Sequence, residues 1–295
     1  MMTQILLGAV SLGLVWAIMT IGVYITYRIL EIADLTVEGS IVMGAALAAQ
    51  AITSGMNPYL ATGLALLGGL AAGLITGLLH TQLKIPALLA GILTMIALYS
   101  INLRIMGKAN ISLLRIDTVY TLFENMGLRG NYAVLAVGFL CVLGIVAILY
   151  WFFGTEIGCA IRATGNNPYM VRAQGINTDV MKIIGLALSN GLVAISGALI
   201  AQSQRFADVQ MGTGAIVIGL ASVIIGEVLF GKKNFLHRLI SLVLGAITYR
   251  IIIALVLKMG MPANDLKLFT ALTVALALAL PMFKSYLHPM KITFR

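Results

Sequence analysis

Long apolar segments separated by short polar ones run along almost the whole chain. About nine of them reach roughly 20 residues, the length that an α-helix needs to cross about 30 Å of hydrocarbon. We find no short segments of alternating apolar and polar residues, which are typical of membrane β-barrels. The pattern therefore predicts an all-α polytopic membrane protein with about nine transmembrane helices, roughly eight to ten, over residues 5–27, 38–55, 59–79, 87–106, 131–153, 180–203, 212–230, 236–257 and 266–284.

Composition excludes a soluble globular domain. Apolar residues make up 60% of the chain and charged residues 10%, with a mean hydropathy of +1.03, whereas soluble domains carry about 25% charged residues. A net charge of +9 would suggest nucleic-acid binding in a soluble protein, but no basic run is interleaved with aromatic residues. Cytoplasmic loops rich in Lys and Arg explain the charge.

Two polar segments interrupt a single transmembrane domain that spans residues 1–295. Residues 107–130 resemble an amphipathic surface helix, and residues 154–179 form the longest stretch without an apolar span. Placing 154–179 in the cytoplasm puts most of the Lys and Arg residues on that side, as expected for a membrane protein. About nine spans then predict an N-terminus outside, a C-terminus inside and an extracytoplasmic segment 107–130.

Glycine patterns suggest how the helices pack. Gly69, Gly73 and Gly77 recur every four residues, a spacing that lets two helices approach closely in lipid. In addition, the segment Gly39–Ala46 is similar to Gly214–Ala221. Because the two copies begin spans that run in opposite directions, they suggest an inverted repeat, which builds many transporters.

Catalytic constellations are absent from the sequence. The three histidines, His80, His237 and His288, are scattered near predicted membrane boundaries, which argues against a metal cluster. There is no Gly-x-x-x-x-Gly-Lys-Ser/Thr loop for ATP. We therefore expect neither an enzyme nor a cofactor or metal site in this chain.

Residues 154–179 carry the chemistry that remains. Glu156 to Thr164 are predicted to be helical, and Asn167 with Pro168 would cap and open a second short helix that ends at Gly175. This helix would expose Met170 and Val171. It would therefore need either the surface of a partner protein or the membrane interface.

The same segment carries a resemblance to a known family. Gly158–Pro168, followed by Arg172, Ala173 and Gly175–Ile176, resembles the "G-x-A-x-R-A-x-G-x-N-P … A-x-x-x-G-I" loop of bacterial ABC importer permeases, the class that includes the branched-chain amino acid and ribose permeases.

Other motifs extend the likeness over nearly the whole chain. Asp34–Ser40 resembles the family's "D-L-S-V-G" segment, with Glu38 as one extra residue. The longer "D-L-T-V-E-G-S" form is similar to a subgroup usually described as tryptophan/tyrosine or other hydrophobic amino acid uptake systems. The further motifs that accompany it are Tyr99-Ser100, Asn102–Gly107, Tyr249-Arg250 and Asp265–Lys267.

The resemblance implies the subunit composition. It implies a multi-pass permease of the inner membrane that works as a homodimer with two ATP-binding-cassette ATPase subunits and an extracytoplasmic solute-binding protein. ATP and Mg would be bound by the ATPase. The residues carried over as the ATPase-docking site are Arg162, Ala163, Asn166, Asn167, Pro168, Met170, Val171, Arg172, Gly175 and Ile176.

Charged residues within spans are the candidates for the substrate pathway, because burying them in a membrane is costly. Arg250 would either attract an anionic group of the substrate or pair with an acid such as Glu38. Glu227 is expected to form a local ion pair with Lys232 or Lys233, and Asp34 and Glu38 to favour the helix N-terminus that they flank. The tentative pathway consists of Glu38, Gly39, Ser40, Gly214 and Arg250.

The sequence is also compatible with other transport functions. A secondary transporter would couple transport to an ion gradient through a site built from broken helices, and an ABC permease for a sugar or a nucleoside would use the same loop. A membrane-embedded enzyme lacks a catalytic constellation.

Overall fold

The computed structural model describes residues 2–128, 130–258, 268–269, 271–272 and 275. Over these residues the fold is helical, with one two-stranded sheet. The elements in chain order are α1 (Met2–Tyr24), the π-helical turn η1 (Ile25–Ile29), α2 (Thr36–Thr53), α3 (Pro58–Thr81), α4 (Ala87–Met106), β1 (Asn110–Ser112), α5 (Thr121–Asn125), α6 (Asn131–Phe152), α7 (Glu156–Asn166), α8 (Pro168–Ala173), α9 (Thr178–Gln204), β2 (Phe206–Asp208), α10 (Ala215–Phe230) and α11 (Phe235–Lys258).

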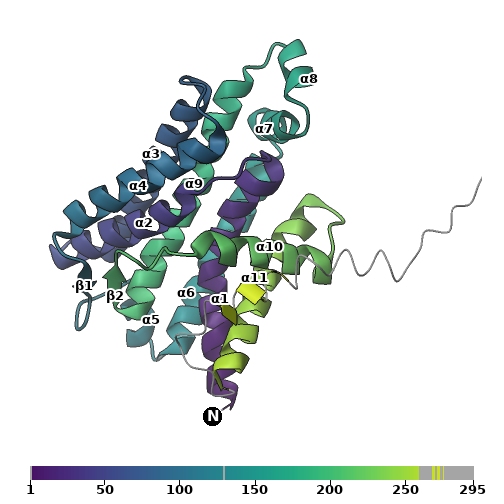
Figure 1. The fold of residues 1–295 in the computed structure, drawn as a ribbon. Helices are drawn as coiled ribbons and strands as arrows, with labels where there is room; N and C mark the ends of the chain where they lie inside the picture. The colour runs from purple at the N-terminus through teal and green to yellow at the C-terminus, as the bar shows by residue number, and fades with distance from the viewer. Residues whose placement is uncertain (1, 129, 259–267, 270, 273–274, 276–295) are drawn as a thin grey trace, which may run out of the picture.

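Three helices form the centre of the bundle. The spans that contain α1, α2 and α9 are 67%, 72% and 72% buried, whereas α3, α4, α6 and α11 are each 33% buried or less. Helices α3 and α4 lie on one side of this centre and α10 and α11 on the other, while α7 and α8 stand at the end opposite the N-terminus (Figure 1). We call this the α7–α8 end.

The predicted spans are confirmed in most of the chain. Seven described helices are long and apolar enough to cross a membrane, and α10 is a shorter apolar helix of 16 residues. The span predicted over 87–106 coincides with α4, and the others agree to within a few residues. The span predicted over 266–284 lies largely outside the described residues, so nine helices stay a prediction.

The glycine row of α3 packs against α9, as predicted. A Cβ atom added to Gly69 or Gly73 would run into the α9 backbone at Asn190 or Leu186, and one on Gly77 would lie 3.0 Å from the Cα atom of Ile183. The two helices therefore pack almost backbone to backbone.

We expect Gly73→Ala to lower the free energy of unfolding by about 1–3 kcal/mol, because the added methyl group has no space beside α9. Gly63 is a matched control on the same helix, since an added Cβ there meets nothing within 4 Å. Gly63→Ala should be neutral or stabilising by up to about 1 kcal/mol. Unfolding of the purified variants in detergent measures both, and equal effects would contradict the close packing.

Two helices begin inside the bundle. The hydroxyl of Thr36, the first residue of α2, lies 2.8 Å from that of Thr76 of α3, which in turn donates to Thr94 of α4. Helix α10 begins after Gly214 (φ +81°), a left-handed conformation that favours glycine. The Gly214 amide donates to Glu38 Oε1 of α2 at 3.0 Å. The starts of the two similar segments thus meet, while the inverted repeat itself stays a prediction.

The segment 107–130 is not the continuous amphipathic helix that its sequence suggests. Gly107 (φ +65°) ends α4, and β1 then pairs antiparallel with β2. Among the described residues of the segment, only Thr121–Asn125 is helical, and Nη2 of Arg205 at the end of α9 donates to both carboxylate oxygens of Glu124 at 3.0 Å. Residues 109–113 make backbone hydrogen bonds with residues 205–209, which lie far away in the sequence.

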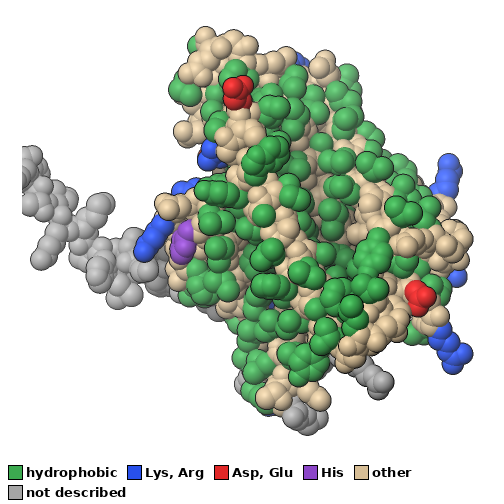
Figure 2. Space-filling view, turned by 180° about the vertical axis from the view of Figure 1, so that it is seen from behind, with side chains coloured by type: hydrophobic (Ala, Val, Ile, Leu, Met, Phe, Trp, Pro, Cys, Tyr) green, Lys and Arg blue, Asp and Glu red, His purple; other side chains and the backbone are tan. Residues whose placement is uncertain are grey.

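The surface matches a bilayer environment. Apolar side chains cover most of the face seen in Figure 2, and Lys and Arg gather at its margins. Large side chains such as Leu67 of α3, Ile148 of α6 and Leu93 of α4 are half exposed or more. Because helices with apolar outer faces are stable only against lipid or another apolar surface, this fold belongs in a membrane.

Candidate functional site

The helix pair α7–α8 forms as the sequence predicts. The Thr155 hydroxyl accepts a hydrogen bond from the Gly158 amide and so caps α7, and Asn167 Oδ1 accepts from the Met170 amide at 3.1 Å and so caps α8. Pro168 opens α8, and Gly175 (φ +81°) follows its end. The caps and the proline position the short α8 beside α7.

The two apolar residues of α8 that were predicted to be exposed, Met170 and Val171, differ in their exposure to solvent. Met170 is 47% exposed and the neighbouring Tyr169 is 81% exposed, but Val171 is fully buried. The expectation that α8 exposes Val171 is therefore wrong. Because successive side chains lie about 100° apart, Val171 lies about 200° around the helix from Tyr169 and faces inward. The exposed apolar tip of α8 consists of Tyr169 and Met170.

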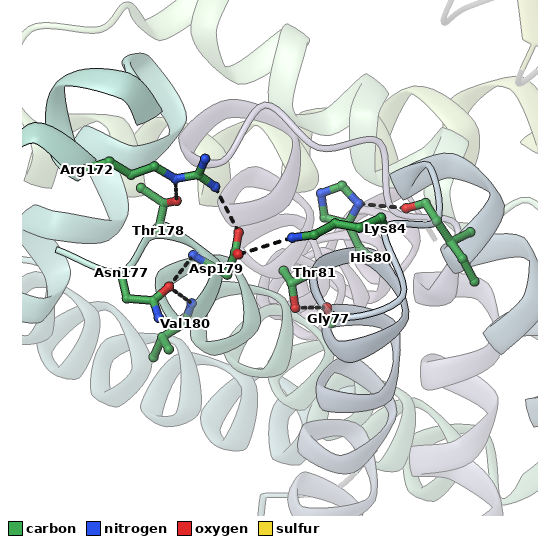
Figure 3. A network of polar contacts seen from close by, with 10 residues as sticks. Gly77, His80, Thr81, Lys84, Arg172, Asn177, Thr178, Asp179 and Val180 are labelled. Carbon is green, nitrogen blue, oxygen red and sulfur yellow. Dashed lines mark hydrogen bonds and ion pairs between the residues drawn. The ribbon is translucent and has the colours of Figure 1, made fainter.

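Polar contacts fasten α8 to the bundle (Figure 3). Arg172 donates from Nε to the Thr178 hydroxyl at 2.6 Å and from Nη2 to Asp179 at 3.2 Å. Asp179 also pairs with Lys84, in the connection between α3 and α4, at 3.4 Å. The arginine therefore links α8 to the start of α9, and Asp179 extends this contact to the connection between α3 and α4.

The remaining residues of the predicted docking site lie in α7 and in the turn after α8. Ala163 and Asn166 lie in the last turn of α7, and the Ile176 amide donates to the carbonyl of Val171 at 3.3 Å. Arg162 is exposed, and its guanidinium is 5.4 Å from the ring centroid of Phe235 and donates to Cys159 Sγ.

A buried polar network crosses the middle of the bundle. Asp34 accepts hydrogen bonds from the Thr36 amide at 2.9 Å and from Asn190 Nδ2 at 2.7 Å, and Ser40 donates to Asn190 Oδ1 at 2.6 Å. Asp34 is 2% exposed, and Ser40 and Asn190 are fully buried. The predicted capping role of Asp34 is confirmed, and Ser40 belongs to this network.

Sequence reasoning missed Asn190, Thr76 and Thr94. Each is a polar residue within an apolar span, and such residues almost always face the interior of a bundle. That signal was available from the sequence, but it does not identify the partner of each residue.

A cavity of about 420 Å³ lies between α2, α4 and the residues before α10. Glu38 lines it and accepts the Gly214 amide on Oε1, while Asn102 donates to the Gly39 carbonyl at 3.1 Å. Asn102 Oδ1 is buried and has no hydrogen-bond partner among the described residues. The lining residues are Glu38, Gly39, Val42, Met95, Ile96, Tyr99, Ser100, Asn102, Val209, Gly212 and Thr213.

This cavity offers one carboxylate and an aromatic ring. Among the residues predicted for the pathway, Glu38 and Gly39 line it and Gly214 supplies the amide that holds Glu38. A small molecule with a positively charged group and an apolar or aromatic body complements this lining.

Arg250 lies outside the cavity beside Glu38. Its guanidinium stacks on the ring of Trp16 of α1, with 4.1 Å between Cζ and the ring centroid, and Glu38 is held by Gly214. The expected pair between Glu38 and Arg250 is therefore absent, and a cation–π contact offsets part of the cost of the charge. Arg250 does not line the cavity.

The expected ion pair between Glu227 and Lys232 is confirmed, and Glu227 also pairs with Arg28. Glu227, whose side chain is 5% exposed, lies 2.8 Å from Lys232 Nζ and 2.7 Å from Arg28 Nη2 of η1. These bonds join the end of α1 to the turn between α10 and α11.

Comparison with known proteins decides the family. The chain matches the family model "Branched-chain amino acid transport system / permease component" over residues 5–280. The chain belongs to this family. As a member, it is a transmembrane permease component of a transport system and not an enzyme.

Two relatives illustrate the range of the family. The permease is 42% identical over 274 residues to a tyrosine transport system permease protein of Clostridioides difficile, covering 93% of this chain and 90% of that one. It is 28% identical over 219 residues to the autoinducer 2 import system permease protein LsrC of Yersinia enterocolitica, covering 73% of this chain and 59% of the relative.

Solved structures share the fold. A metal-chelate type ABC transporter in an inward-facing conformation matches the permease with a TM-score of 0.51 at 16% identity, over 95% of this chain and 85% of that chain. PsaBC from Streptococcus pneumoniae matches with a TM-score of 0.50 at 15% identity, over 93% and 90% of the two chains. The permease is therefore a multi-pass membrane protein with the fold of an ABC transporter permease.

Proposed function

We propose that this permease imports a hydrophobic amino acid, most specifically an aromatic one such as tyrosine, across the inner membrane. It does so as a homodimer with two ATPase subunits and an extracytoplasmic solute-binding protein. The observation that carries the proposal is the 42% identity to a tyrosine transport system permease over nearly the whole of both chains.

The cavity beside Glu38 suits this substrate class. The Glu38 carboxylate attracts an α-ammonium group, because a charge in a low-dielectric site interacts strongly with an opposite charge. Tyr99, which lines the cavity and is 53% exposed, offers its ring to an aromatic side chain.

The ATPase drives transport by binding at the α7–α8 end. The exposed Tyr169 and Met170 insert into an apolar cleft of the ATPase, and Arg172 with Asp179 passes its movement to α9 and to Lys84. Since α9 carries Asn190 and so contacts Asp34 beside the start of α2, the same helix connects the ATPase to the region of the cavity.

This mechanism requires α7–α8 in the cytoplasm and the N-terminus outside. In a Cys141→Ala background, an impermeant thiol reagent should miss the exposed Cys159 in intact cells and label it in inverted vesicles. A cysteine introduced at the exposed Ser112 should show the opposite pattern. Labelling of Cys159 from outside would invert the orientation and remove the ATPase argument.

The substrate is tested by uptake in proteoliposomes that contain the permease, its ATPase and its solute-binding protein. ATP-driven accumulation of labelled tyrosine that excess phenylalanine suppresses and excess ribose does not is the expected result. Glu38→Gln should reduce this uptake at least about tenfold, because the loss of one close ion pair with the substrate costs more than about 1.4 kcal/mol. Uptake of ribose but not tyrosine would assign the permease to sugars, and uptake driven by an ion gradient without ATP would overturn the importer mechanism.

A further inference from the structure

A basic pocket of about 390 Å³ lies at the α7–α8 end, beside the end of α1. Four cationic side chains from three parts of the chain line it: Arg28 of η1, Arg162 of α7, and Lys233 and Arg238 at the start of α11. One carboxylate, that of Glu31, also lines it. The pocket therefore carries an excess of positive charge.

Three of these cations have no carboxylate partner within the described residues. Arg28 is bound to Glu227 at 2.7 Å, but Arg162, Lys233 and Arg238 form no ion pair there. Arg162 instead contacts the ring of Phe235. Gathering like charges costs free energy unless an anion offsets it, so the pocket is suited to a negatively charged group.

An aromatic recess joins this pocket to the membrane surface. Arg162, Asn234 and Phe235 line both the basic pocket and a neighbouring recess of about 650 Å³, which is also lined by Tyr150 and Trp151 of α6. These two aromatic residues end the α6 span and are 53% and 71% exposed. Tyr and Trp at the end of a span are typical of the membrane–water interface.

An apolar groove continues from the recess into the bilayer. Tyr150 and Leu236 belong to the recess and also to a groove of about 680 Å³ between α6 and α11. Its other lining residues, among them Ala147 of α6, are all apolar and come from α1, α6 and α11.

We infer that these three connected hollows bind one anionic phospholipid. Its phosphate lies among Arg162, Lys233 and Arg238, its glycerol beside Tyr150 and Trp151, and an acyl chain in the groove between α6 and α11. The order of the hollows, from charged through aromatic to apolar, is the order of the parts of a phospholipid along the membrane normal. The leaflet rests on the orientation proposed above, but the binding itself does not.

The lipid would connect the ATPase-docking loop to the transmembrane helices. Arg162 belongs to α7, whereas Lys233 and Arg238 belong to the turn before α11 and to α11 itself. A phosphate shared among them ties α7 to α11, and the Arg28–Glu227–Lys232 ion pairs hold the same turn. An anionic lipid at this position would stabilise the coupling loop for ATPase docking.

Lipid retention tests the inference without a transport assay. Full-length permease is purified from nanodiscs of phosphatidylcholine mixed with phosphatidylglycerol, and native mass spectrometry counts the lipids that stay bound. Retention of one phosphatidylglycerol in preference to phosphatidylcholine is the expected result. Lys233→Gln combined with Arg238→Gln should weaken retention about 30-fold, at about one factor of five for each charge. Lys182→Gln, which removes a cation of α9 that does not line the pocket, should leave retention unchanged.

A second variant tests the groove independently of charge. Ala147 is exposed in the groove, so Ala147→Trp should fill it and reduce retention of both lipids. The neighbouring Ile148, which is 63% exposed and does not line the groove, gives the matched control Ile148→Trp. Equal retention of both lipids by the unmodified permease would overturn the inference, as would equal losses in variants and controls. Density for a second copy, or for this chain's own C-terminal residues, in the groove would also overturn it.

Discussion

Tyr169→Asp combined with Met170→Asp should abolish binding of the ATPase and leave the permease folded. The two side chains are the exposed apolar tip of α8, and a carboxylate cannot enter an apolar cleft without losing its hydration. If each residue contributes as a hot spot of about 2 kcal/mol, the double variant binds roughly 1,000-fold more weakly. Co-purification of the ATPase with tagged permease measures the loss.

Two further variants make this result specific. Met126, which is 74% exposed beyond α5 at the other end of the fold, provides the control Met126→Asp, and this variant should retain the ATPase fully. Val171→Asp should instead prevent folding, because Val171 is fully buried. Normal ATPase recovery with the Tyr169/Met170 variant would show that the partner binds another surface.

Asn190→Leu should be among the most destabilising single substitutions in the bundle. Asn190 donates to Asp34 at 2.7 Å and accepts from Ser40 at 2.6 Å, so its removal leaves a buried carboxylate and a buried hydroxyl short of partners. We expect the free energy of unfolding to fall by at least about 3 kcal/mol. Thermal unfolding in detergent, followed by fluorescence, measures the change.

The neighbouring Ser189 is the control for this substitution. It donates one hydrogen bond of 2.7 Å to the Gly22 carbonyl, so Ser189→Ala should cost only about 1 kcal/mol. Replacing Asp34 and Asn190 together by Leu should cost less than the sum of the single changes, because two interacting partners are removed at once. Additive losses would show that the two residues do not interact.

The sequence predicts the helices of this permease well and their contacts less well. Apolar length places eight of the predicted spans close to the observed helices, because the bilayer thickness dictates that length. The cap at Asn167, the start at Pro168 and the end near Gly175 also follow from local chemistry. Each of these features depends on residues within one helical turn.

Contacts between distant segments could not be predicted in this way. The β1–β2 pair forms from residues 110–112 and 206–208, and its three-residue strands carry no recognisable pattern. For Arg250 the sequence suggests either an anionic group of the substrate or an acid such as Glu38 as the partner, yet the guanidinium stacks on Trp16. The sequence reveals that a buried charge needs a partner, but only the packing of α1 against α11 decides which partner lies close enough.

Docking of the α8 tip in a cleft of the ATPase is tested most directly by a photoreactive amino acid placed at Met170, in the assembled complex under native conditions. We expect a crosslink from position 170 to the ATPase subunit and none from the same amino acid at position 126. A complex that crosslinks from position 126, or only from elsewhere on the permease, would show that the ATPase does not hold the α8 tip.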